Sequence, residues 1–181
     1  MFKKQTVKAV DLIYGEDVMK LYLCEKPSQG RDVAVELNAT KRADGYLMNA
    51  DGSIVITSGI GHLVEQFHPE QYDAALKKWL FETLPIIPNQ WNVGPKKETA
   101  KQYKIVLGFI KKASTVIISM DADREGEMIA RELLELANFR GKIQRCWLTA
   151  LDPENIRKAL TTLKNNQKTE FLPGDNSSLQ H

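Results

Sequence analysis

Apolar and polar stretches alternate along this chain in a way that predicts strands and helices in turn. Short apolar runs at 20–24, 115–118 and 142–148 are typical of buried strands. Helical spacing follows the first two runs, at 31–37 and 128–138. Strands that alternate with helices predict a mainly parallel sheet with helices on its faces, which is an α/β fold.

Turn residues predict two further elements. Apolar segments on both sides of Asp51-Gly52 predict a hairpin near residues 45–58. Asp152 followed by Pro153 is typical of a helix start, because aspartate is a good N-cap and proline suits the first helical position.

The segment at 69–95 is rich in tryptophan and proline. We expect a short helix near 70–79 and then an extended, proline-stiffened crossing of the domain surface. Its aromatic side chains are expected to pack, with base stacking as the alternative. Lysines recur along a predicted helix at 98–112, where they form either a solvated face or a surface for a phosphate backbone.

A chain of 181 residues suits one domain. We expect that domain to span 19–165. Residues 1–18 show no strong period and are expected to be a flexible extension, with a start codon assigned too early as the alternative. Residues 166–181 are polar and turn-rich and are expected to be a disordered tail.

Composition narrows the class of protein. A hydrophobic content of 43% and a charged content of 27% fit a globular domain, and a net charge of +2 leaves any basic surface local. The apolar runs are too short to span a membrane, and no secretory signal is visible, so the cytoplasm is the expected compartment. Cys24 and Cys146 are expected to be buried thiols, without a disulfide or metal role.

Carboxylates gather where the predicted strands end. Asp121, Asp123 and Glu125 follow the strand at 115–118, and alternate residues of an extended segment point to one side. Clustered carboxylates repel one another unless a cation neutralises them, and Mg²⁺ is a hard cation that takes one or two carboxylates. The alternative is that these acids stabilise a helix N-terminus.

Two other residues occupy comparable positions. Glu25 follows the strand at 20–24, and ligands of parallel α/β sheets bind outside the carboxyl ends of the strands. A solvated loop acid is the alternative. His62 lies between glycines in the turn at 58–63, which suggests a close approach to a ligand or to another backbone segment. A purely structural histidine is the alternative there.

Three motifs, in this order, resemble the TOPRIM domain shared by type IA topoisomerases, primases and some nucleases. They are Leu-Cys-Glu-Lys-Pro-Ser at 23–28, Gly-Ile-Gly-His-Leu at 59–63 and Asp-Ala-Asp-Arg-Glu-Gly at 121–126. The Glu-Lys-Pro-Ser form and Leu-Pro-Ile-Ile-Pro-Asn-Gln-Trp at 84–91 resemble the bacterial topoisomerase III branch. The resemblance covers about 19–172.

The resemblance implies a TOPRIM (Rossmann-like) sheet that binds Mg²⁺ through Asp121, Asp123 and Glu125. Glu25 would take part in proton transfer beside the scissile phosphate, and Lys26 would contact that phosphate. Further contacts to DNA or phosphate are expected from Ser28, His62 and Arg124.

In that family a tyrosine of a later domain attacks a phosphate of single-stranded DNA, a second strand passes through the gap, and the free 3′-hydroxyl reseals it without ATP. None of the chain's five tyrosines stands in a context that resembles this nucleophile. The resemblance therefore implies a TOPRIM part that is inactive alone, with single-stranded DNA and the missing domains as partners and a bacterial chromosome or plasmid as its location. The alternatives are a stand-alone TOPRIM nuclease, whose acids would activate water through the metal, and a non-catalytic DNA-binding module.

Overall fold

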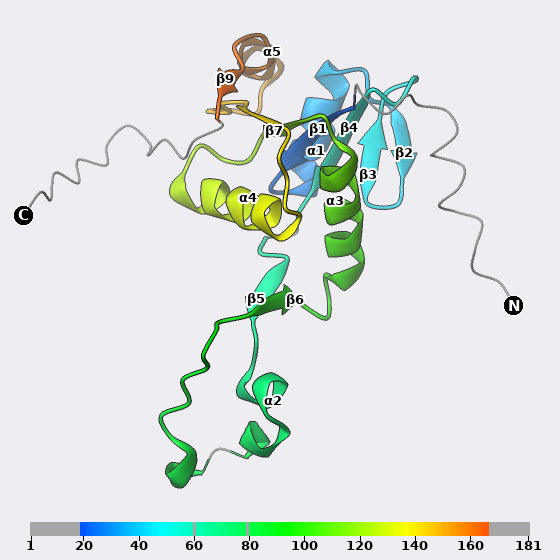
Figure 1. The fold of residues 1–181 in the computed structure, drawn as a ribbon. Helices are drawn as coiled ribbons and strands as arrows, with labels where there is room; N and C mark the ends of the chain where they lie inside the picture. Colours follow the sequence, from blue (N-terminus) through cyan, green and yellow to red (C-terminus); the bar gives the residue numbers. More distant parts are fainter. Residues whose placement is uncertain (1–18, 60, 79, 167–181) are drawn as a thin grey trace, which may run out of the picture.

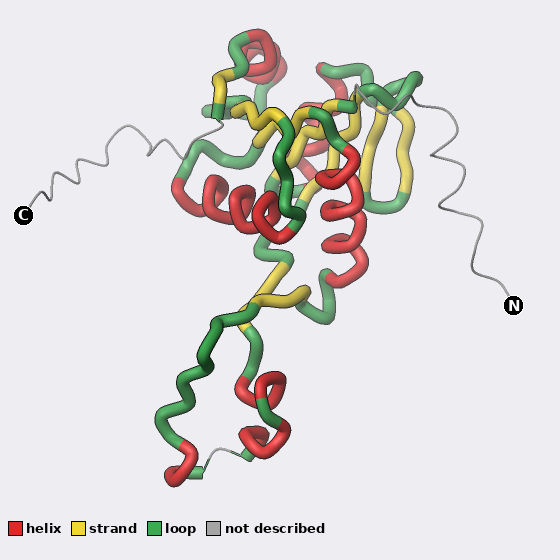
Figure 2. Tube along the Cα trace, viewed as in Figure 1, coloured by secondary structure: helices red, strands yellow, loops and turns green. Residues whose placement is uncertain are grey.

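A computed structural model describes residues 19–59, 61–78 and 80–166. Figures 1 and 2 show a central sheet with helices on both faces and an arm that projects from it. The sheet has the strand order β2-β3-β4-β1-β7-β8-β9. Its strands are β1 (Lys20–Cys24), β2 (Lys41–Ala43), β3 (Tyr46–Met48), β4 (Ile54–Ser58), β7 (Thr115–Ile118), β8 (Lys142–Arg145) and β9 (Lys164–Asn165). The longer helices are α1 (Pro27–Glu36), α3 (Ala100–Lys112), α4 (Arg124–Leu136) and α5 (Pro153–Thr161).

The four central strands β4, β1, β7 and β8 are parallel, and antiparallel strands extend the sheet at both edges. β3 and β4 form the hairpin that the sequence predicts around Asp51-Gly52. The predicted α/β class, with a mainly parallel sheet, is confirmed. Because β1 and β7 are parallel neighbours, their carboxyl ends meet at one edge of the sheet.

Side chains of each central strand alternate between two cores. Leu21 and Leu23 of β1 pack in the core that includes residues of α3 and α4. Tyr22 and Cys24 pack on the opposite face, in the core that includes residues of α1 and α5. This period of two explains why β1 is apolar throughout, since a strand covered on both faces has no solvated side.

Several predicted boundaries are wrong. α1 begins at Pro27 and not at Arg31, because proline is well tolerated in the first helical turn. The helix expected at 70–79 is broken at Asp73, whose extended backbone separates α2 (Pro69–Tyr72) from a 3₁₀ turn at 74–77. β8 ends at Arg145, short of the predicted Leu148.

The segment between β5 (Val64–Gln66) and β6 (Val93–Pro95) forms the projecting arm (Figure 1). These two strands pair with each other and not with the main sheet. The expectation that the aromatics here are packed is wrong for Trp91, which is 60% exposed, and for Phe81, which is 89% exposed. Trp79 lies outside the described residues.

Cys24 and Cys146 are both buried, as predicted, and both are free thiols. In the described part of the chain, no helix is long and apolar enough to cross a membrane. The expected extension at 1–18 lies outside the described residues, as does the expected tail except for Asn166. That residue is buried and bonded to the domain, so the packed chain continues one residue past the predicted boundary.

Candidate metal and phosphate site

Glu25, Lys26 and Asp121 come together at the edge where β1 and β7 end. The Lys26 ammonium lies 3.2 Å from Glu25 Oε1 and 3.2 Å from Asp121 Oδ2. The Lys26 side chain is 58% exposed and the Glu25 side chain only 13%. The hydrogen bonds to Asp121, first, and to Glu25 raise the pKa of Lys26 above its usual value. A protonated amine therefore lies between two acids at the surface. The Lys26–Asp121 hydrogen bond joins residues that are 95 positions apart in the sequence.

Gln29 orients this group, and sequence reasoning did not find it. Its side chain is almost fully buried, and its Nε2 donates to Asp121 Oδ1 at 2.9 Å. Its Oε1 accepts a hydrogen bond from the backbone N–H of Glu25, also at 2.9 Å. The amide thus joins the loops after the two strands. The sequence feature that could have pointed to Gln29 is its position, one helical turn after Glu25 and on the face of α1 that packs against the sheet.

Asp123 is the N-cap of α4. Its Oδ1 accepts a hydrogen bond from the N–H of Gly126 at 2.7 Å, which is the helix-start role that the sequence left open as an alternative. A Cβ at Gly126 would lie 2.8 Å from the carbonyl oxygen of Asp121. Glycine therefore allows the first turn of α4 to pack against the acidic loop.

Glu125 lies further out, in the exposed first turn of α4. Its Oε1 is 3.5 Å from Nε2 of His62, an ion pair only when the imidazole is protonated. The Glu125 and His62 side chains are 65% and 37% exposed. The turn that carries His62 thus comes within reach of the acidic loop. Arg124 and Ser28 are also exposed, each in the first turn of its helix.

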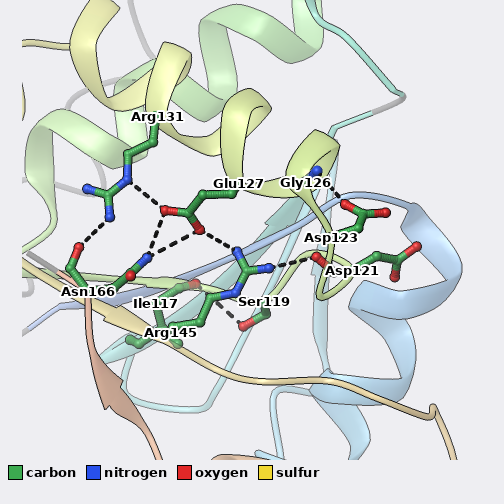
Figure 3. Close-up of polar contacts among 9 residues, drawn as sticks. All are labelled: Ile117, Ser119, Asp121, Asp123, Gly126, Glu127, Arg131, Arg145 and Asn166. Carbon is green, nitrogen blue, oxygen red and sulfur yellow. Dashed lines mark hydrogen bonds and ion pairs between the residues drawn. The ribbon is translucent and has the colours of Figure 1, made fainter. Parts of the chain in front are cut away.

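A buried ionic network lies beneath the loop, and sequence reasoning did not assign it a role (Figure 3). Glu127 accepts from Arg145 Nη1 at 3.0 Å, from Arg131 Nε at 2.8 Å and from Asn166 Nδ2 at 3.0 Å. Arg145 Nη2 donates to the carbonyl oxygen of Asp121 at 2.6 Å. Burial lowers the pKa of Arg145, and the charge of Glu127 opposes that effect. Arg145 thereby fixes the backbone from which the Asp121 side chain projects.

The acids do not form a preformed cage for a cation. Among the residues that the structure describes, no three His, Cys, Asp or Glu side chains are grouped closely enough to hold a metal ion by themselves. Asp121 and Asp123 instead lie in the loop after β7, and Glu125 lies in the first turn of α4. Each of the three carboxylates contacts different partners. A cation here would take one or two carboxylates and complete its shell with other oxygens, which is the usual habit of Mg²⁺.

The fold is thus an α/β sheet whose acidic loops converge at its carboxyl edge, which is where parallel α/β sheets in general bind their ligands. A family model described as "Toprim domain" matches residues 20–151. The chain therefore belongs to the Toprim domain family.

The chain is also similar to bacterial proteins named DNA topoisomerase 3. It is 39% identical to that of Haemophilus influenzae over 166 residues, which are 89% of this chain and 25% of the relative. It is 38% identical to that of Staphylococcus haemolyticus over 154 residues, which are 84% of this chain and 21% of the relative. The chain thus spans about a quarter or less of the curated relatives that it matches.

A solved structure of full-length topoisomerase I from Thermotoga maritima has the same fold in one part. The TM-score is 0.51 at 18% sequence identity, and the match covers 80% of this chain and 21% of that one.

Proposed function

We propose that this chain is the metal- and phosphate-binding part of a type IA DNA topoisomerase of the topoisomerase III kind. The complete protein would cleave and rejoin single-stranded DNA with Mg²⁺, and so relax and decatenate DNA by strand passage without ATP. One observation carries the proposal: the Lys26 ammonium is held within 3.2 Å of both Glu25 and Asp121 at the carboxyl edge of two parallel strands. Ligands of such sheets bind at this edge.

The acids suit Mg²⁺ in their chemistry, being hard oxygen donors that are at least partly exposed. Asp121, Asp123 and Glu125 would hold the ion, and water and phosphate oxygens would complete its shell. Bound there, Mg²⁺ would neutralise negative charge on the phosphate oxygens.

Lys26 and Glu25 have separate roles in this proposal. The Lys26 ammonium, kept protonated by its raised pKa, would contact the scissile phosphate and stabilise the charge that develops on it. Glu25 would hold the proton that passes between the attacking tyrosine hydroxyl and the departing 3′-hydroxyl. That tyrosine is proposed to belong to the part of the topoisomerase that this chain does not span. Ser28, His62 and Arg124 would contact neighbouring phosphates.

The experiment is to incubate the purified chain with Mg²⁺ and end-labelled single-stranded DNA. We expect binding without cleavage and without a covalent adduct. Replacing Lys26 by glutamine should weaken binding about fivefold, since one phosphate contact is lost. Lys142→Gln is the matched control, because Lys142 starts β8 at the opposite edge of the sheet.

Three results would contradict the proposal in different ways. Equal binding by Lys26→Gln and the wild type would remove Lys26 from the DNA site. Turnover that disappears in Asp121→Asn would identify a nuclease that is complete in itself. A denaturant-resistant protein–DNA adduct would place the nucleophile within this chain.

A further inference from the structure

A groove of about 440 Å³ lies next to the candidate site, between α1 and the edge strands β2 and β3. Arg42, Leu47 and Ile56 stand opposite one another on β2, β3 and β4. Residues directly opposite in a sheet share a face. Leu47 and Ile56 pack in the core on the α1 side, so Arg42 belongs to that side as well. This row forms one wall of the groove.

α1 supplies the facing wall through Pro27, Gly30 and Arg31. A Cβ at Gly30 would lie 3.6 Å from Ile56 Cγ2, so α1 approaches β4 closely at this point. Ser58, the last residue of β4, closes the groove at the carboxyl edge of the sheet. Pro27, which directly follows Lys26 in the sequence, belongs to the lining, whereas Lys26 itself does not.

The charge of the groove is one-sided. Arg31 and Arg42 enter its lining from two different elements, and both residues are exposed. Neither side chain has a hydrogen-bond or ion-pair partner among the described residues, and no described carboxylate lines the groove. Two acids adjoin the lining in sequence: Asp44, which is paired with Lys101, and Asp32, which follows Arg31 and is exposed outside the lining. The two guanidinium groups are therefore available to an anion.

The lining combines these cations with apolar surface from Pro27, Leu47 and Ile56. Guanidinium groups bind phosphate oxygens through paired N–H donors, and an apolar wall suits the flat faces of a sugar and base. The volume lies within the range of ordinary small-molecule sites. We propose that the groove binds a nucleotide, with its phosphate at Arg31 and Arg42. The nucleotide is either a free mononucleotide or one unit of a DNA strand, and only the second source rests on the proposed function.

The test is a titration of the full chain with thymidine 5′-monophosphate in the presence of EDTA. Binding is measured from the changes in the backbone amide chemical shifts. Working without metal separates this site from the proposed Mg²⁺ chemistry. We expect shifts at Leu47 and Ile56 and at least about tenfold weaker binding in Arg31→Gln/Arg42→Gln. Thymidine, which lacks the phosphate, should bind the wild-type chain more weakly than the monophosphate does, by a similar factor. Arg140→Gln is the control, because Arg140 is an exposed arginine that precedes the start of β8 at the opposite edge of the sheet.

A parallel titration with a short oligothymidylate distinguishes the two sources of the nucleotide. Loss of oligonucleotide affinity in the double variant indicates a strand in the groove, whereas loss for the mononucleotide alone indicates a free nucleotide. Both results support the groove as a nucleotide site. If neither ligand responds to the double variant, or if Arg140→Gln weakens binding equally, the inference is wrong. Failure of Lys26→Gln to affect DNA binding would leave this result intact, so the two proposals fail separately.

Discussion

Replacing Glu127 by glutamine is expected to lower the free energy of unfolding by about 3 kcal/mol, because it leaves a buried arginine charge without its partner. The Arg145 side chain is 3% exposed and that of Glu127 is 13% exposed. Arg145 Nε already has no hydrogen-bond partner among the described residues. The neutral amide keeps the size of the side chain but turns one acceptor into a donor, facing donors on Arg145 and Asn166.

Urea denaturation measures this change, with Glu135→Gln as the control. Glu135 is exposed and lies on the same helix, so its substitution should stay within about 0.5 kcal/mol of the wild type. A loss below about 1 kcal/mol for Glu127→Gln would mean that the network adds little to stability. The Asp121 carbonyl would then need another explanation for its position.

Alkaline pH should destabilise the domain through its buried thiols. Burial raises the pKa of Cys146 from 9.0 to about 11, with a hydrogen bond to Ser119 acting in the opposite direction. Burial also raises the pKa of Cys24, and it raises that of Tyr22 to about 12. A group whose pKa is raised by folding contributes its stability below the unfolded pKa. That contribution is lost as pH rises, because the unfolded chain releases the proton first.

For Cys146 alone, the free energy of unfolding should fall by about 2 kcal/mol between about pH 8 and pH 11. Denaturation at a series of pH values measures the slope, and Cys146→Ala should have a shallower one. The comparison uses slopes because the smaller side chain also changes stability at neutral pH. Identical slopes would show that the Cys146 thiol ionises as easily in the folded chain as in the unfolded one.

Local signals in the sequence predicted the central strands, the hairpin and the meeting of two acidic loops. The runs at 20–24 and 115–118 are buried on both faces, so their apolar character is unambiguous. Adjacent parallel strands then bring Glu25 and Asp121 to one edge. The edge strands β2 and β9 were not predicted, because they are two or three residues long and mostly exposed.

Long-range contacts explain what the sequence could not predict. Gln29 precedes the helix predicted at 31–37, and Arg145 lies within the strand predicted at 142–148. Both resemble ordinary polar residues there, and only the fold brings them to Asp121. Trp91 looks like a packing residue by its chemistry, yet it lies on an arm that leaves the sheet. Asp123 fits both a helix cap and a metal ligand, since one carboxylate has two oxygens, and the structure accounts for one of them.

Thermal unfolding with and without Mg²⁺ tests most directly whether the acidic loop binds this ion, as we propose. Binding to the folded state alone should raise the melting temperature by a few degrees at millimolar Mg²⁺. Asp123→Asn is the informative variant, because asparagine caps a helix as well as aspartate does. Its melting temperature without metal should match the wild type. Asp152→Asn makes the same change at the N-cap of α5 and serves as the control.

We predict that the Mg²⁺ shift shrinks markedly in Asp123→Asn and in Asp121→Asn, and persists in Asp152→Asn. Equal shifts in all four proteins would contradict the assignment of the loop at 121–125 as the metal site.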